Sequence, residues 1–221
     1  MAGKTPTQNL QQALEEVQSH LEAGDQRIKA WYSDDFDPPE NFPELETAPH
    51  QYLIEGGAQL HSFAADLTES SVELGDPAND AELVLYGVGM ERLLTGVYLK
   101  VDSAEFIQKM VEKGVTPSFR DCKWVLIEEL TERLPSEQCG MVVLVLDILW
   151  ELRNNEAHLG YHSYYPAQVR RLFLEVSCLI QQLFADSEPA ELDRIREVIE
   201  ERRNQRAPAA QTVEFDLSRS P

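Results

Sequence analysis

A permanent cation and a titratable imidazole stand five residues apart where Arg153 is followed by His158. A guanidinium neutralises phosphate charge, and an imidazole accepts or donates a proton near neutral pH. Cleavage of a phosphodiester without a metal ion needs both groups. The pair follows a long apolar run and is closely followed by Gly160, so we expect it at the end of a helix.

The spacing leaves three interpretations open. Five residues of an ideal helix rotate the chain by about 500°, which leaves Arg153 and His158 roughly 140° apart. They converge within one chain if the helix ends between them, with His158 in the last turn and Gly160 as terminator. Alternatively, two copies of the motif meet across a dimer. In the third interpretation both side chains only stabilise the negative end of the helix dipole, by about 0.3–1 kcal/mol each.

Hydrophobic periodicity predicts helices along almost the whole chain, and therefore an all-α fold. We expect an antiparallel bundle of about four to five core helices plus flanking helices. The helices are expected near residues 8–31, 50–74, 136–158 and 188–205, with others opened by Asp80, by capping signatures at 102–105 and 118–121, and by Pro166.

Three details of this prediction concern the core. The segment 136–158 is apolar on both sides and is expected to be the buried centre of the fold, although a strand competes with a helix for its first half. Asp80 is expected to cap the helix that follows it. Within that helix the glycines at 87, 89 and 96 predict close approach of neighbouring helices, because each glycine costs about 1 kcal/mol relative to alanine.

The charge is strongly acidic and uneven. The chain has a net charge of −20, and residues 1–80 hold 16 acids against 3 bases. The scarcity of Lys, 6 residues against 13 Arg, resembles haloarchaeal proteins. In molar salt the screening length falls to about 3 Å, so this charge does not exclude a nucleic-acid ligand. We divide the chain into an acidic N-terminal helix with a Pro-rich linker (1–49), a helical bundle (50–206) and a flexible tail (207–221).

Cysteine and histidine usage indicates a reduced, cytoplasmic protein. Cys122, Cys139 and Cys178 are far apart and odd in number, so we expect free thiols in the core. The remaining histidines outside the motif region, at 20, 50 and 61, form no constellation in the sequence and are expected to be surface or core residues. The longest apolar run, residues 141–150, is too short to span a bilayer.

The segment Leu152–His158 resembles the R-x4–6-H motif of the HEPN superfamily, including the asparagine directly after the arginine. The context is similar too: an apolar helix, a short loop that carries tyrosines, and another amphipathic helix. The resemblance implies a bundle of four to five helices that dimerises around two such motifs. Many members are metal-independent endoribonucleases of toxin–antitoxin and antiviral systems. Others are non-catalytic modules that bind nucleotides or proteins.

The resemblance also implies roles for individual residues. His158 would be the general base or acid, Arg153 would hold the phosphate, and Asn154 would orient the site. Apart from the resemblance, Glu91 stands among apolar neighbours in its expected helix and is a supporting candidate that could pair with Arg153, or else a solvated side chain beside Arg92. Tyr161 is a second supporting candidate. Expected partners are RNA or a nucleotide, a second copy and a nucleotidyltransferase-type antitoxin, with no cofactor, metal or membrane. In one toxin branch a tyrosine follows two residues after the histidine, whereas Gly160 occupies that position here.

Overall fold

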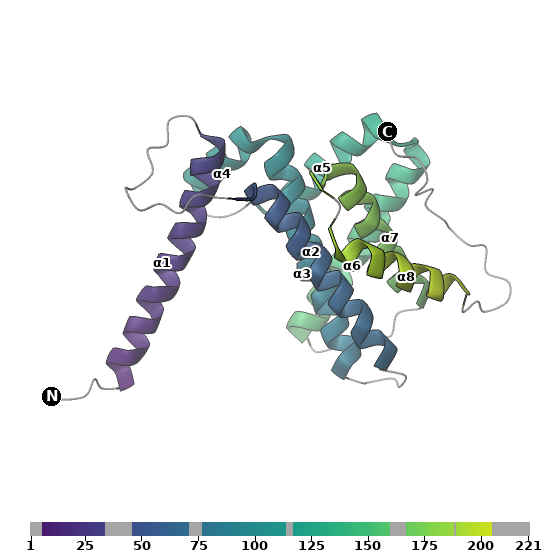
Figure 1. Ribbon diagram of the computed structural model, residues 1–221, viewed down its shortest axis with the longest axis horizontal. Coiled ribbons are helices and arrows are strands. Elements are labelled where there is room, and N and C mark those ends of the chain that lie inside the picture. Colours follow the sequence, from purple (N-terminus) through teal and green to yellow (C-terminus); the bar gives the residue numbers. More distant parts are fainter. Residues whose placement is uncertain are drawn as a thin grey trace.

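The computed structural model describes residues 6–33, 46–70, 77–113, 117–159, 167–187 and 189–204. Within these ranges the chain is an all-α bundle of eight helices, as the periodicity predicted (Figure 1). Their bounds are α1 Pro6–Tyr32, α2 Pro49–Ser70, α3 Pro77–Val101, α4 Ser103–Lys113, α5 Phe119–Arg133, α6 Ser136–Leu159, α7 Ala167–Phe184 and α8 Glu191–Asn204. The linker from 34 to 45 and the tail from 205 lie outside the described residues.

The centre of the fold is α3, which contacts α2, α4, α5, α6 and α7. Its six periodic apolar side chains are at most 1% exposed: Leu83, Tyr86, Met90, Leu93, Leu94 and Val97. The expectation that 136–158 is the buried centre is therefore wrong, although the segment is helical and not a strand. Leu144 of α6 is 60% exposed, because the Asp147 and Glu151 side of this helix faces solvent.

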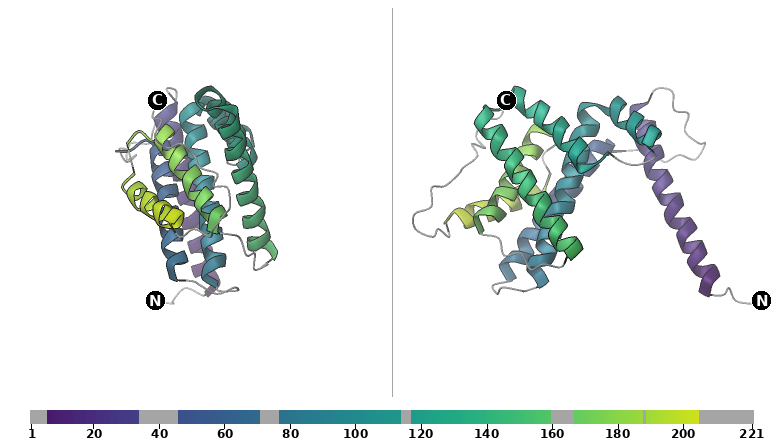
Figure 2. Two further views of the ribbon diagram at one scale, coloured as in Figure 1. Left: turned by 90° about the vertical axis from the view of Figure 1, so that its right-hand side faces the viewer. Right: turned by 180° about the vertical axis from the view of Figure 1, so that it is seen from behind.

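Glycines allow α2 and α3 to pack back to back, and the two helices lie side by side in Figures 1 and 2. A Cβ atom on Gly57 would lie 2.8 Å from the carbonyl oxygen of Gly89, and one on Gly96 would lie 2.9 Å from that of His50. Real Cβ atoms do not approach backbone so closely. The predicted link between glycine and close helix approach is confirmed at these positions.

The helix ends test the capping predictions. Ser118 caps α5 in a reciprocal capping box with Asp121, and the Asp102 side chain accepts a hydrogen bond of 2.9 Å from the Glu105 N–H at the start of α4. The expectation that Asp80 caps α3 is wrong, because the helix already begins at Pro77. Proline fits the first helical turn, since its φ is preset and its missing N–H is not needed there.

Polar contacts join the end of α1 to three other parts of the fold. The Tyr32 hydroxyl lies 2.5 Å from Nδ1 of His50, and Nε2 of His50 lies 2.6 Å from Asp186. Asp186 also accepts a hydrogen bond of 2.5 Å from Lys100, which lowers its pKa. Burial raises the pKa of Tyr32 to about 12. His50 therefore does belong to a constellation, contrary to the prediction, because its partners come from distant parts of the sequence.

Candidate functional site

Arg153 lies on the side of α6 that packs against α3, and its stem crosses a glycine. A Cβ atom on Gly87 would lie 2.3 Å from Cγ and 2.9 Å from Cβ of Arg153. Any larger side chain at position 87 would occupy the space that the arginine stem fills. The space left by the missing side chain of Gly87 holds the stem of Arg153, and we call this space the seat of Arg153. Glu91 lies one helical turn further along α3.

The guanidinium of Arg153 is held by neighbours from both helices. Its Nη2 lies 3.4 Å from Oε2 of Glu91, and its Nη1 donates to the side-chain oxygen of Asn154 at 3.0 Å. The pairing with Glu91 that the sequence suggested is present. The Trp150 ring, 5.6 Å from the guanidinium carbon, adds a cation–π contact. These contacts fix the orientation of the guanidinium group before any ligand binds.

Part of the hydrogen-bonding capacity of Arg153 is left over. Its side chain is 22% exposed, and its Nε is buried without a hydrogen-bond partner among the residues that the structure describes. A guanidinium has five N–H donors, and Glu91 and Asn154 engage one each. The remaining donors suit a phosphate or carboxylate, which arginine binds with two parallel hydrogen bonds.

Position 158 lies on another side of the same helix. Because α6 continues to Leu159, the helix does not end between the two motif residues, whereas position 158 does lie in its last turn, just before Gly160. Helical rotation places position 153 in register with the buried Val142 and Leu146. It places position 158 in register with the exposed Asp147 and Glu151. A continuous helix leaves two interpretations open: a dimer that brings the two groups together, or side chains that only stabilise the end of the helix.

The remaining predicted residues have different outcomes. Asn154 is partly buried, and its side-chain oxygen accepts the hydrogen bond from Arg153. Tyr161 and the other loop tyrosines fall within 160–166, outside the described residues. In the part of the chain that is described, no group of three or more His, Cys, Asp or Glu side chains is placed to hold a metal ion. The three cysteines are free and buried, as predicted.

Sequence reasoning did not identify Gly87 or Trp150 as parts of this site. Trp150 precedes Arg153 by three residues, a spacing that puts two side chains on one helix face, so the sequence held a signal for it. Gly87 precedes Glu91 by four residues on α3, which also places both on one face. The signal for Gly87 becomes readable only once α3 and α6 are known to be neighbours.

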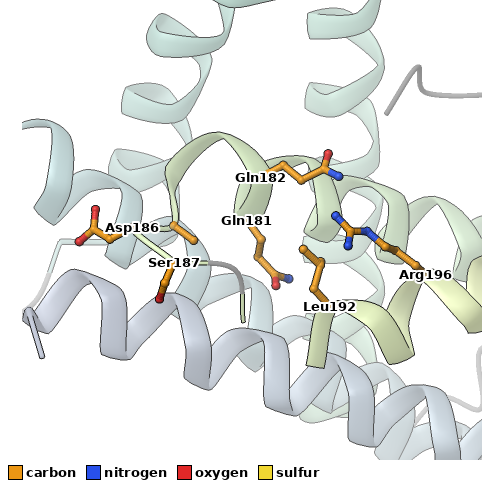
Figure 3. Close-up of a pocket in the computed structure, with 7 residues that line it drawn as sticks. Gln181, Gln182, Asp186, Ser187, Leu192 and Arg196 are labelled. Atoms are coloured by element: carbon orange, nitrogen blue, oxygen red, sulfur yellow. The ribbon is translucent and has the colours of Figure 1, made fainter. Parts of the chain in front are cut away.

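A separate shallow pocket lies between α7 and α8 (Figure 3). Its lining residues are Gln181, Gln182, Ala185, Asp186, Ser187, Leu192 and Arg196. None of them belongs to the Arg153 site. Asp186, one of the lining residues, already contacts Lys100 and His50, so the pocket adjoins that polar network.

No helix in the described ranges is both long and apolar enough to cross a membrane. Comparisons of the chain with protein-family models, with curated proteins and with solved structures find no match.

Proposed function

We propose that this chain is a metal-independent endoribonuclease of HEPN type, in which Arg153 from one copy and His158 from another act on the same phosphate. The supporting observation is the seat of Arg153. A guanidinium that is oriented by Glu91 and Asn154, 22% exposed, and left with further N–H donors on Nη1 and Nη2 can bind an anion. The resemblance of residues 152–158 to the HEPN motif supplies the reaction class.

The chemistry follows from the two groups. The His158 imidazole takes the proton of a ribose 2′-hydroxyl, whose oxygen then forms a bond to phosphorus. Arg153 stabilises the added negative charge on the phosphate oxygens. The bond from phosphorus to the 5′-oxygen breaks, and that oxygen leaves with a proton delivered by an imidazolium. The products are a 2′,3′-cyclic phosphate and a 5′-hydroxyl.

The product ends and the metal dependence test this proposal directly. Purified protein should cleave RNA in molar KCl with excess EDTA, at the same rate as with Mg²⁺. Mapping of the fragments should show 2′,3′-cyclic phosphate and 5′-hydroxyl ends, and substrates with a 2′-deoxy sugar at the cleaved bond should resist. Cleavage that requires a divalent ion, or that leaves 3′-hydroxyl ends, would contradict the mechanism.

One observation favours a second candidate function. The Glu91 carboxylate lies 3.4 Å from the guanidinium and offsets part of its charge, which lowers its attraction for a polyanion. A non-catalytic module that binds a nucleotide or a protein needs only the remaining donors. Nucleotide binding that Arg153→Gln abolishes, combined with no cleavage of diverse RNAs, would favour this alternative.

Gly87→Ala is expected to displace Arg153 without touching the chemistry. The added methyl would lie 2.3 Å from Cγ of Arg153, so α3 and α6 must separate. Overpacking of this kind costs about 1–3 kcal/mol of unfolding free energy. A shift of about 1 Å in a positioned group lowers activity by roughly 10²-fold. Denaturant titration and RNA cleavage kinetics measure the two effects.

Gly140→Ala is the matched control, because a Cβ atom at this exposed position of α6 meets nothing within 4 Å. We expect it to gain up to about 1 kcal/mol from helix propensity and to cleave RNA normally. Equal activity of the two alanine variants would show that the seat of Arg153 has no role in the function.

A further inference from the structure

The exposed part of α1, residues 11–19, has almost no tertiary support. Figures 1 and 2 show this helix leading away from the bundle. The described residues 11–19 are exposed all round, with Leu14 at 61% and Val17 at 55% exposure. Only the last turns are anchored, where Ile28 packs against the core and Tyr32 contacts His50. An isolated helix gains little stability in water, so a long unsupported one calls for a packing partner.

The apolar positions of α1 follow a regular repeat. They alternate in steps of four and three over residues 10–21: Leu10, Leu14, Val17 and Leu21. After Gly24 comes Ile28, which packs against the core of its own chain. Alternating steps of four and three average 3.5 residues, which is the period of helices that supercoil in pairs. A helix seated in an irregular groove of a different protein has no need to keep this period. The repeat therefore indicates a helical partner with matching spacing.

The charges on α1 favour a second copy of the same helix as its packing partner. The acidic residues Glu15, Glu16 and Glu22 take positions away from the apolar stripe. The flanking positions hold Gln11, Ala13, Gln18, His20, Asp25 and Arg27, so they carry one acid and one base. In a chain of net charge −20, this face lets a second copy approach without setting acids against acids.

We propose that the 10–21 face of α1 packs against the same face of a second copy as a two-helix coiled coil. The contacts of Tyr32 with His50 and of His50 with Asp186 hold the base of this arm in the bundle. The inference rests on the exposure, period and charge of α1 and not on the proposed ribonuclease function. The proposed function requires a dimer, and this coiled coil would be one of the contacts that hold the dimer together.

Sedimentation equilibrium of the full chain in molar KCl tests the coiled coil. Leu14→Glu combined with Val17→Glu puts two charges into the apolar stripe and should weaken self-association at least about 100-fold. The matched control is Ser19→Glu combined with Gln26→Glu, which adds the same charge to exposed positions of the same helix outside the stripe. The control should dimerise like the unmodified chain.

A crosslinking measurement checks the result independently of any loss of helix. The native cysteines are all buried, so an introduced cysteine reports alone. Val17→Cys should join two copies through a flexible bis-maleimide at least tenfold faster than Ser19→Cys, which lies on the outer side of the coil. An unmodified chain that is monomeric at micromolar concentration, or glutamate variants that dimerise as tightly as the control pair, would overturn the inference. Arg153→Gln should still dimerise, so failure of the ribonuclease proposal is separately visible.

Discussion

Replacing His158 by alanine is expected to lower the rate of RNA cleavage by about 10²–10⁴-fold, the usual contribution of a positioned proton-transfer group. Arg153→Gln should lower it comparably, because the charge that faces the phosphate is lost while an amide donor remains for Glu91. Each variant should retain the helix content and cooperative unfolding of the unmodified chain. Initial rates on one RNA substrate, with EDTA present, measure the effect.

Mixing the two inactive variants is the sharper test, because it asks whether the site is shared. In a heterodimer of His158→Ala with Arg153→Gln, one of the two Arg153/His158 pairs keeps both groups and the other keeps neither. Half of the dimers in an equal mixture are heterodimers, so about a quarter of the original activity should return. If each chain carried a complete site, mixing would restore nothing. Co-expression with two affinity tags allows the heterodimer itself to be purified and assayed.

Arg92→Gln is the control for this pair of variants. Arg92 is exposed on α3 directly beside Glu91 but does not contact Arg153 in the described structure. Its loss removes the same charge from the same neighbourhood and should leave the cleavage rate unchanged. Cleavage that survives both His158→Ala and Arg153→Gln would remove these residues from the mechanism and leave the motif with a structural role.

Much of the fold was predictable because local sequence determines helices. The 3.6-residue period identified the buried stripe of α3, and the cap at Ser118 was readable from three residues of spacing. The pairing of Glu91 with Arg153 was also within reach, since both are polar residues beside buried apolar runs. The start of α3 was missed because Asp80 offered a good cap, whereas Pro77 fixes an earlier first turn.

Features that depend on which helices are neighbours could not be read from the sequence. The burial of α6 was overestimated, because an apolar composition does not say how many neighbours a helix has, and Leu144 faces solvent. Likewise, nothing local marks Gly87 as the seat of Arg153. The contacts among Tyr32, His50 and Asp186 link residues 18 and 136 positions apart, and no spacing rule reaches so far.

His61 presents a buried titratable group with no part in the proposed reaction. It is 0% exposed, between α2, α3 and α7, with Nε2 lying 3.0 Å from the Tyr86 carbonyl oxygen and Nδ1 lying 2.6 Å from the Ser177 hydroxyl. A carbonyl can only accept, so Nε2 carries the proton and Nδ1 accepts from Ser177. Burial disfavours the charged ring and lowers the pKa of His61 to about 4.

Acidification should therefore destabilise the fold through this one residue. The unfolded chain binds a proton at His61 near pH 6.5 and the folded chain only near pH 4, so stability is fully present above pH 6.5 and falls as the pH drops between these values. The full loss is about 3 kcal/mol, with about 2 kcal/mol of it reached by pH 5. Urea unfolding of the unmodified chain and of His61→Gln, compared at each pH, isolates this contribution from that of the carboxylates. The glutamine variant should be less stable at pH 7.5, and the difference should shrink towards pH 5. A difference that stays constant over this range would mean that His61 titrates alike in the folded and unfolded chains.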